Sequence, residues 1–266
     1  MQPEQIAGAA LTVTAVVIAK KHKALDDAGI LAALVIALIL LVLEAKLLLL
    51  MMLFFFTSSA FTFLGYERKE KTGAAERKAG RSASQVLCSG SVPAFITLAA
   101  VLLPPAERQA LVLAAAASIA YANADTWAAE IGSLSRSQPV LITNPRVRVP
   151  HGVSGGVTVQ GELGAVAGSA VIAAAAGLLN MFSPASIPLI FAMGWVGEIV
   201  DAIIGASLQI KYKCPKCNVL TDKEVHVCGA RTVRAGGLKH VKNEIVNLLT
   251  ESAVSLATFA FTLWCL

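Results

Sequence analysis

Charged and aromatic residues are scarce in this chain of 266 residues, at 15% and 6% of the sequence, while hydrophobic residues reach 56%. So little charge cannot cover a large soluble domain, and the composition is that of a polytopic membrane protein. Abundant alanine, leucine and glycine favour closely packed transmembrane helices with small residues at their contacts. The predicted fold class is therefore all-α, a polytopic transmembrane helix bundle.

Two missing sequence patterns narrow the function classes further. No Gly-Lys-Ser/Thr follows the glycine-rich segment at residues 151–158, which excludes a Walker A loop. The first apolar run has neither a basic leader nor a small-residue cleavage site, so we expect a retained helix instead of a signal peptide. The net charge of +5 lies in the loops of a membrane protein, and we expect no nucleic-acid partner.

Eight apolar runs predict membrane-spanning helices, at residues 6–19, 29–43, 47–64, 86–103, 109–124, 161–179, 187–207 and 246–266. A span needs about 20 residues, so the first two runs are marginal in length. If the N-terminus lies outside, the loops on one side hold every Lys and Arg except Lys46 and Arg108. The positive-inside rule makes that side cytoplasmic. We expect a single integral domain over residues 1–266 in the cell membrane, with a cytoplasmic insertion at residues 211–236.

Residues 123–158 interrupt the apolar sequence with polar and ionisable side chains, which are costly in a bilayer and usually functional. In a regular helix Asn123 and Glu130 share a face and Asp125 points away from it. We therefore expect the helix to unwind here and bring the three together, as discontinuous helices do around ion sites. The alternative is a helix C-terminus capped by Asn and Asp side chains.

A glycine-rich segment then leads into the next helix, with Ser154, Gly155, Gly156 and Thr158. Bare backbone N–H groups and the positive end of a helix dipole can bind an anion at such a place. Alternatively, the glycines only permit tight turns.

Carboxylates recur in the run at residues 187–207, where Gly194, Glu198, Asp201 and Gly205 are four, three and four residues apart. This spacing places both acids on one small-residue face directed at neighbouring helices. Two carboxylates at such a short separation repel each other unless they share a proton or a cation. We expect Mg²⁺ bound by Asp201 and Asp125; the alternative is a hydrogen-bonded pair that stabilises the bundle.

Two further groups of polar residues have both a functional and a structural interpretation. Arg77, Lys78 and Arg81, followed by Gln85, form a basic cluster at a membrane boundary that either binds phosphate or only anchors the chain. Asn243 and Asn247 begin the last apolar helix one turn apart, and either line the same site as the acids or pair with neighbouring helices.

Four metal-binding side chains lie close together in the last polar loop. Cys214 and Cys217 form a C-x2-C pair, and His226 and Cys228 follow it. Because protein side chains would fill all four positions of a tetrahedral site, the pattern favours structural over catalytic Zn²⁺.

Several of these segments together resemble a known family. The resemblance rests on 78–86, 123–132, 139–143, 152–158, 197–201, 205–209 and 243–247, in this order from the third predicted helix onward. These segments resemble the integral membrane family called domain of unknown function 92, which includes a chloroplast phytyl-phosphate kinase. The cysteine loop resembles that of prokaryotic and archaeal members.

The resemblance implies transfer of the γ-phosphoryl group of a nucleoside triphosphate to an isoprenyl monophosphate, and CTP is the nucleotide that we expect. Asp125, Glu198 and Asp201, with Asn123 and Glu130, would then be catalytic. The basic cluster, the glycine-rich segment, Asn243 and Asn247 would bind phosphates or substrate. A homo-oligomer is compatible with this interpretation. The alternative functions are a transporter or lipid-phosphate flippase, which also keeps intramembrane acids, and a non-catalytic membrane scaffold.

Overall fold

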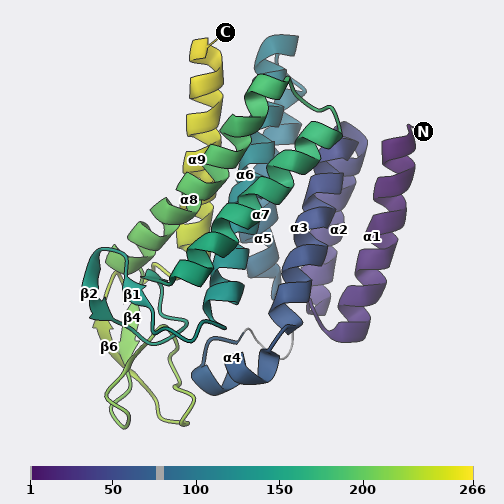
Figure 1. Cartoon of the computed structure of the whole chain (residues 1–266). Helices are drawn as coiled ribbons and strands as arrows, with labels where there is room; N and C mark the ends of the chain where they lie inside the picture. The colour runs from purple at the N-terminus through teal and green to yellow at the C-terminus, as the bar shows by residue number, and fades with distance from the viewer. Residues whose placement is uncertain (1, 76–80, 266) are drawn as a thin grey trace.

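The computed structural model describes residues 2–75 and 81–265, and within them the chain forms nine α-helices, one 3-10 helix and six short strands (Figure 1). The helices are α1 (Pro3–His22), α2 (Asp27–Leu43), α3 (Ala45–Phe63), α4 (Tyr66–Thr72), α5 (Ala83–Ala100), α6 (Pro105–Gly132), α7 (Val159–Leu178), η1 (Pro184–Ser186), α8 (Ile187–Ser207) and α9 (Asn243–Cys265). The strands are β1 (Val140–Leu141), β2 (Asn144–Arg148), β3 (Gly156–Val157), β4 (Lys211–Lys213), β5 (Leu220–Thr221) and β6 (Val233–Gly236).

The predicted helical membrane fold is confirmed, whereas the count of eight spans is not. Each predicted apolar run overlaps a helix, and the short α4 is an additional one. Among the described residues, five helical segments are long and apolar enough to cross a membrane: α3, α5, α7, α8 with η1, and α9. Helix α2 is apolar but shorter.

Helix α6 is the centre of the bundle and packs against α3, α5, α7, α8 and α9 (Figure 1). Its run of four alanines at 114–117 is fully buried. The helix is continuous through Asp125 and ends only at Gly132, so the expected unwinding is wrong. The physical reason is that no proline or glycine interrupts residues 106–131, and alanine is the best helix former.

Helix α7 approaches α6 closely because three glycines line the contact. A Cβ atom at Gly164 would lie 2.9 Å from the carbonyl oxygen of Trp127, and one at Gly168 would lie 3.0 Å from that of Asn123. Gly161 is similarly close to Ala128. Spacing small residues three and four apart lets two helix backbones meet without intervening side chains.

The polar loops form two small antiparallel sheets, with strand orders β2-β1-β3 and β5-β4-β6. Figure 1 shows both sheets and α4 at one end of the bundle, opposite the chain termini; we call this the sheet end. The helix ends that meet there bring the polar residues of distant segments together.

Candidate functional site

A cavity of about 200 Å³ lies at the sheet end, where α6, α7, α8 and α9 meet the two sheets. Five carboxylate side chains line it, and no Lys or Arg of the described residues does. We call it the acidic pocket; its acids are Asp125, Glu162, Glu198, Asp201 and Asp222. Such a concentration of negative charge favours a bound cation.

The regular geometry of α8 places two of these acids in the pocket. Glu198 and Asp201 lie on the buried face of α8 with Gly194 and Gly205, as the spacing predicted. The Tyr121 hydroxyl of α6 donates a hydrogen bond of 2.7 Å to Oδ2 of Asp201. Oε2 of Glu198 is buried with no hydrogen-bond partner among the described residues, so a polar partner from outside the chain would satisfy it.

The structure brings together many of the residues that the sequence singled out. The acidic pocket includes Asp125, Glu198, Asp201, Ser154, Gly155, Gly156, Thr158 and Asn243. Their assembly supports the expectation of one shared site, while their chemical roles stay predictions.

Asn123 and Glu130 do not join this group. The Asn123 side chain accepts a hydrogen bond of 3.2 Å from Ser58 of α3 and donates one of 2.8 Å to the carbonyl oxygen of Gly168 in α7. Glu130 accepts hydrogen bonds from Thr62 and from the ammonium group of Lys69. Because α6 stays helical, this face and the face of Asp125 point in different directions, and these two residues connect helices outside the pocket.

The expected phosphate-binding cluster is divided. Arg77 and Lys78 lie outside the described residues. Arg81 and Gln85 line a different, larger cavity between α1, α2, α3 and α5. Asn247 belongs to α9 one turn beyond Asn243, but it does not line the acidic pocket.

The glycine-rich segment forms a tight turn whose backbone donors are mostly in use. Gly155 has a positive φ of 76°, and a Cβ there would lie 2.4 Å from that of Ala206. The amide of Ser154 donates to Asp222, and that of Gly156 to the carbonyl of Val153. This geometry supports the tight-turn interpretation more than an open anion site at these two amides.

Asp222 is a pocket residue that the sequence analysis missed. Its Oδ2 accepts hydrogen bonds of 2.8 Å from the Ser154 amide and 2.9 Å from Gln209 Nε2. Burial raises the pKa of Asp222, and the nearby Lys211 opposes this shift. Burial likewise lowers the pKa of Lys211, whose ammonium group donates to the Ser154 carbonyl oxygen at 2.8 Å. The segment Leu-Thr-Asp-Lys carries no pattern that distinguishes it from an ordinary polar loop.

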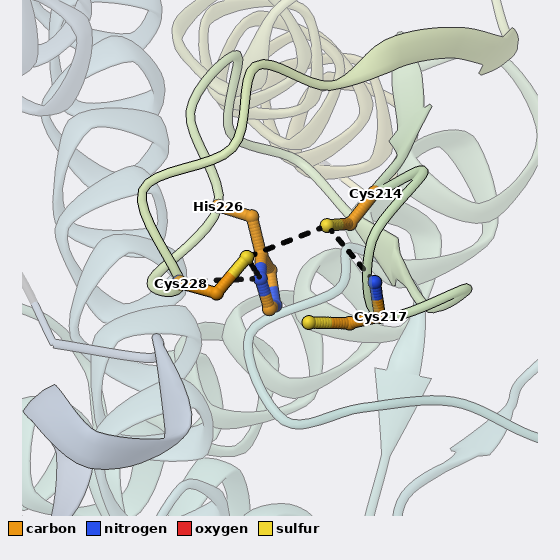
Figure 2. A group of neighbouring side chains, drawn as sticks. All are labelled: Cys214, Cys217, His226 and Cys228. Carbon is orange, nitrogen blue, oxygen red and sulfur yellow. Dashed lines mark hydrogen bonds between the residues drawn. The ribbon is translucent and has the colours of Figure 1, made fainter.

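The Cys/His cluster is assembled as predicted (Figure 2). The ligand atoms of Cys214, Cys217, His226 and Cys228 all lie within 4.8 Å of one another. The Cys214 and Cys228 sulfurs are 3.6 Å apart, and Nδ1 of His226 is 3.1 Å from the Cys228 sulfur. Two sulfurs bound tetrahedrally to zinc at about 2.3 Å would be about 3.8 Å apart. The cluster could therefore hold a metal ion, and its sulfur–sulfur distance is compatible with Zn²⁺.

The carboxylates of the acidic pocket are spaced more widely. Among the described residues, no three of them bring oxygens within the 4.8 Å that the Cys/His cluster satisfies. The described part of the chain therefore shows no ready-made site of three carboxylates for Mg²⁺, and Mg²⁺ bound by Asp125 and Asp201 stays a prediction. These acids can supply only part of a coordination shell.

Helices suited to a membrane, an acidic pocket and a Cys/His loop define a polytopic membrane protein with a polar site at one end of its bundle. The profile of the integral membrane protein family DUF92 matches residues 10–255, and the chain belongs to this family.

Relatives occur in plants and archaea. The chain is 28% identical to Protein PGR of Arabidopsis thaliana, over 90% of both chains. It is 25% identical to the chloroplastic Protein VTE6 of the same plant, over 74% of this chain and 53% of that one. An uncharacterized membrane protein of Methanocaldococcus jannaschii is 32% identical over 49% of this chain and 52% of its own. No solved structure matches the chain.

Proposed function

We propose that this protein is an isoprenyl-phosphate kinase of the membrane. It transfers the γ-phosphoryl group of a nucleoside triphosphate, with CTP as the first choice, to phytyl, geranylgeranyl or a related isoprenyl monophosphate. The products are the isoprenyl diphosphate and the nucleoside diphosphate. The observation that carries the proposal is the acidic pocket, which lies at an end of the bundle where a water-soluble nucleotide and a membrane lipid can meet. Membership of DUF92 supports it, since the family resemblance implies this reaction.

The transfer itself needs alignment and charge neutralisation more than covalent chemistry by the protein. An oxygen of the isoprenyl phosphate attacks the γ-phosphorus and forms the new P–O bond. The bond from the γ-phosphorus to the bridging oxygen breaks, and that oxygen leaves on the nucleoside diphosphate with the electron pair. A phosphate monoester is mostly dianionic at neutral pH, so the attacking oxygen needs no strong base.

The pocket residues fit a nucleotide that arrives with its cation. Mg²⁺ typically binds through one or two carboxylates together with substrate phosphates, and it would neutralise phosphate charge there. Asp125 and Asp201 would hold it, which requires no complete cage of protein ligands. Tyr121 orients Asp201 through its hydrogen bond. Oε2 of Glu198, which has no hydrogen-bond partner in the described part of the chain, is available to a substrate hydroxyl or to the cation.

We place this site on the cytoplasmic face of the cell membrane, because nearly all Lys and Arg residues lie in loops predicted on that side. We also propose that the Cys/His cluster holds one structural Zn²⁺. Residues 211–236 would then be an insertion into one integral membrane domain, folded around that ion.

The test uses purified protein in detergent with Mg²⁺, γ-labelled CTP or ATP, and geranylgeranyl or phytyl monophosphate. We expect labelled diphosphate product, and a loss of at least about a hundredfold in turnover for Asp201→Asn and Asp125→Asn. Glu67→Gln, which changes an exposed acid of α4, is the matched control and should keep full activity.

Two results would contradict the proposal. Full activity of both aspartate variants would refute their assignment to the reaction. A folded protein that transfers no phosphoryl group from any nucleotide would refute the kinase and favour a transporter or lipid-phosphate flippase.

A further inference from the structure

A second cavity, of about 480 Å³, lies between α1, α2, α3 and α5, and we call it the apolar cavity. Most of its wall consists of aliphatic and aromatic side chains, among them Ile36, Met51 and Phe55. Two of its polar side chains already have partners: Thr12 donates to the carbonyl oxygen of Gly8, and Thr62 donates to Glu130. Its volume is in the range of small-molecule sites, and its wall suits a hydrocarbon chain.

One end of the apolar cavity is basic. His22, Lys23 and Arg81 line it where α1 ends and α5 begins, and no Asp or Glu of the described residues lines the cavity anywhere. In the described part of the chain, neither Lys23 nor Arg81 forms an ion pair. The nearby Asp26 is engaged as the N-cap of α2, where it accepts from the Gly29 amide at 2.7 Å.

Backbone hydrogen bonds hold Arg81 at this basic end of the apolar cavity. Its amide donates to the Ala24 carbonyl oxygen at 2.9 Å, and its own carbonyl accepts from the Asp26 amide at 3.1 Å. These bonds join the start of α5 to the connection between α1 and α2. A substitution of the Arg81 side chain leaves them intact, so the charge can be tested separately from the fold.

We propose that the apolar cavity is the binding site for the isoprenyl monophosphate, with the hydrocarbon chain between the helices and the phosphate at Arg81 and Lys23. The identity of the ligand rests on the proposed function. Charge complementarity selects it over an uncharged lipid, since a phosphate satisfies two cations that have no acidic partner among residues 2–75 and 81–265. The acidic pocket, by contrast, is lined by five acids and suits the cation and its nucleotide.

Helix α1 ends at the sheet end of the bundle (Figure 1), so the basic end of the apolar cavity and the acidic pocket lie at the same end. Ala74 lines the acidic pocket and Arg81 the apolar cavity. Seven residues of chain span at most about 25 Å, which limits the distance between these two positions. A hydrogen bond also links the walls of the two cavities. Thr62 of α3, which lines the apolar cavity, donates to Glu130 of α6, the helix that carries Asp125 of the acidic pocket.

The experiment measures binding of radiolabelled geranylgeranyl monophosphate to the full-length protein in detergent, without nucleotide. Ala33→Phe fills the cavity from α2 and is expected to weaken binding at least about tenfold. The control is Leu31→Phe, because Leu31 is 65% exposed and does not line the cavity. Ser89→Phe, which fills the cavity from α5, replaces Ala33→Phe if that variant does not fold.

The charge is tested with Arg81→Gln, and Lys21→Gln serves as a basic control outside the cavity. We expect Arg81→Gln to weaken monophosphate binding about tenfold and to leave binding of the uncharged geranylgeraniol unchanged. A matching loss for both lipids would show that the charge is not what binds the phosphate, and would overturn the assignment.

Other outcomes separate this inference from the kinase. Unchanged binding in the cavity-filling variants and in Arg81→Gln would overturn it even if phosphoryl transfer is observed. Displacement of the probe by phosphatidate as readily as by unlabelled ligand would also overturn it, by making the cavity a general phospholipid site. Binding as expected without any transfer would support the cavity and refute the kinase.

Discussion

The ion pair between Lys69 of α4 and Glu130 of α6 gives a sharp test of what Glu130 does. Both side chains are buried, with 1% and 9% of their surface exposed. Removal of one partner leaves a buried charge uncompensated, at a cost of about 3–5 kcal/mol, whereas removal of both is often nearly neutral. We therefore expect Lys69→Met to destabilise the protein by about this amount and the double variant Lys69→Met/Glu130→Gln to recover most of it.

The assay is thermal unfolding in detergent, followed by loss of monodisperse protein. A change of 1 kcal/mol corresponds to about 2–4 °C in a chain somewhat shorter than this one, so Lys69→Met should lower Tm by about 6–20 °C. The exposed pair of Lys242 and Glu224, 3.6 Å apart, is the control, and Lys242→Met should change stability by less than about 1 kcal/mol. If Lys69→Met and Lys242→Met gave the same Tm, the pair would not stabilise the bundle.

The double variant also tests the role of Glu130 in the reaction. Glu130 lies on a face of α6 that does not line the acidic pocket, so a stable double variant should keep phosphoryl transfer. A stable but inactive double variant would instead make Glu130 catalytic, as the family resemblance implied.

Three further predictions concern the loops. Gly155→Ala should destabilise the protein by more than about 1 kcal/mol in a thermal scan; Gly229→Ala, at a similar φ of 80° but with nothing within 4 Å of the new Cβ, should cost less, and equal effects would exclude a steric cause. We expect elemental analysis to detect one zinc per chain, which Cys214→Ser should abolish and Cys88→Ser should retain; zinc retained in both variants would refute the site. Asp222→Asn should lower transfer at least about tenfold without a change in Tm, and an unchanged rate would show that this acid is not needed.

Regular spacing made part of the site predictable. The four- and three-residue intervals of α8 correctly placed Glu198 and Asp201 on one buried face, because a helix without breaks fixes that geometry. The Cys/His cluster followed from its sequence pattern, since a C-x2-C pair with a second pair of His and Cys close behind it is typical of zinc sites.

Contacts between distant segments were not predictable in the same way. Asn123 pairs with Ser58 of α3 and with the α7 backbone, and no local pattern indicates those partners. The expected unwinding of α6 was wrong because it assumed that polar residues close in sequence serve one site. Asp222 enters the pocket through the fold of the β4–β5 sheet, which periodicity does not reveal.

The position of α6 at the centre of the bundle has a consequence for how the protein is made. Its 28 residues include Glu107, Arg108, Asp125 and Glu130, and it is not among the helices apolar enough to cross a membrane by themselves. Charged residues make the transfer of an isolated helix into lipid unfavourable. We therefore expect α6 to leave the translocation channel paired with α5, to which it is joined by only four residues, and to become stable as α7, α8 and α9 replace its early contacts with lipid.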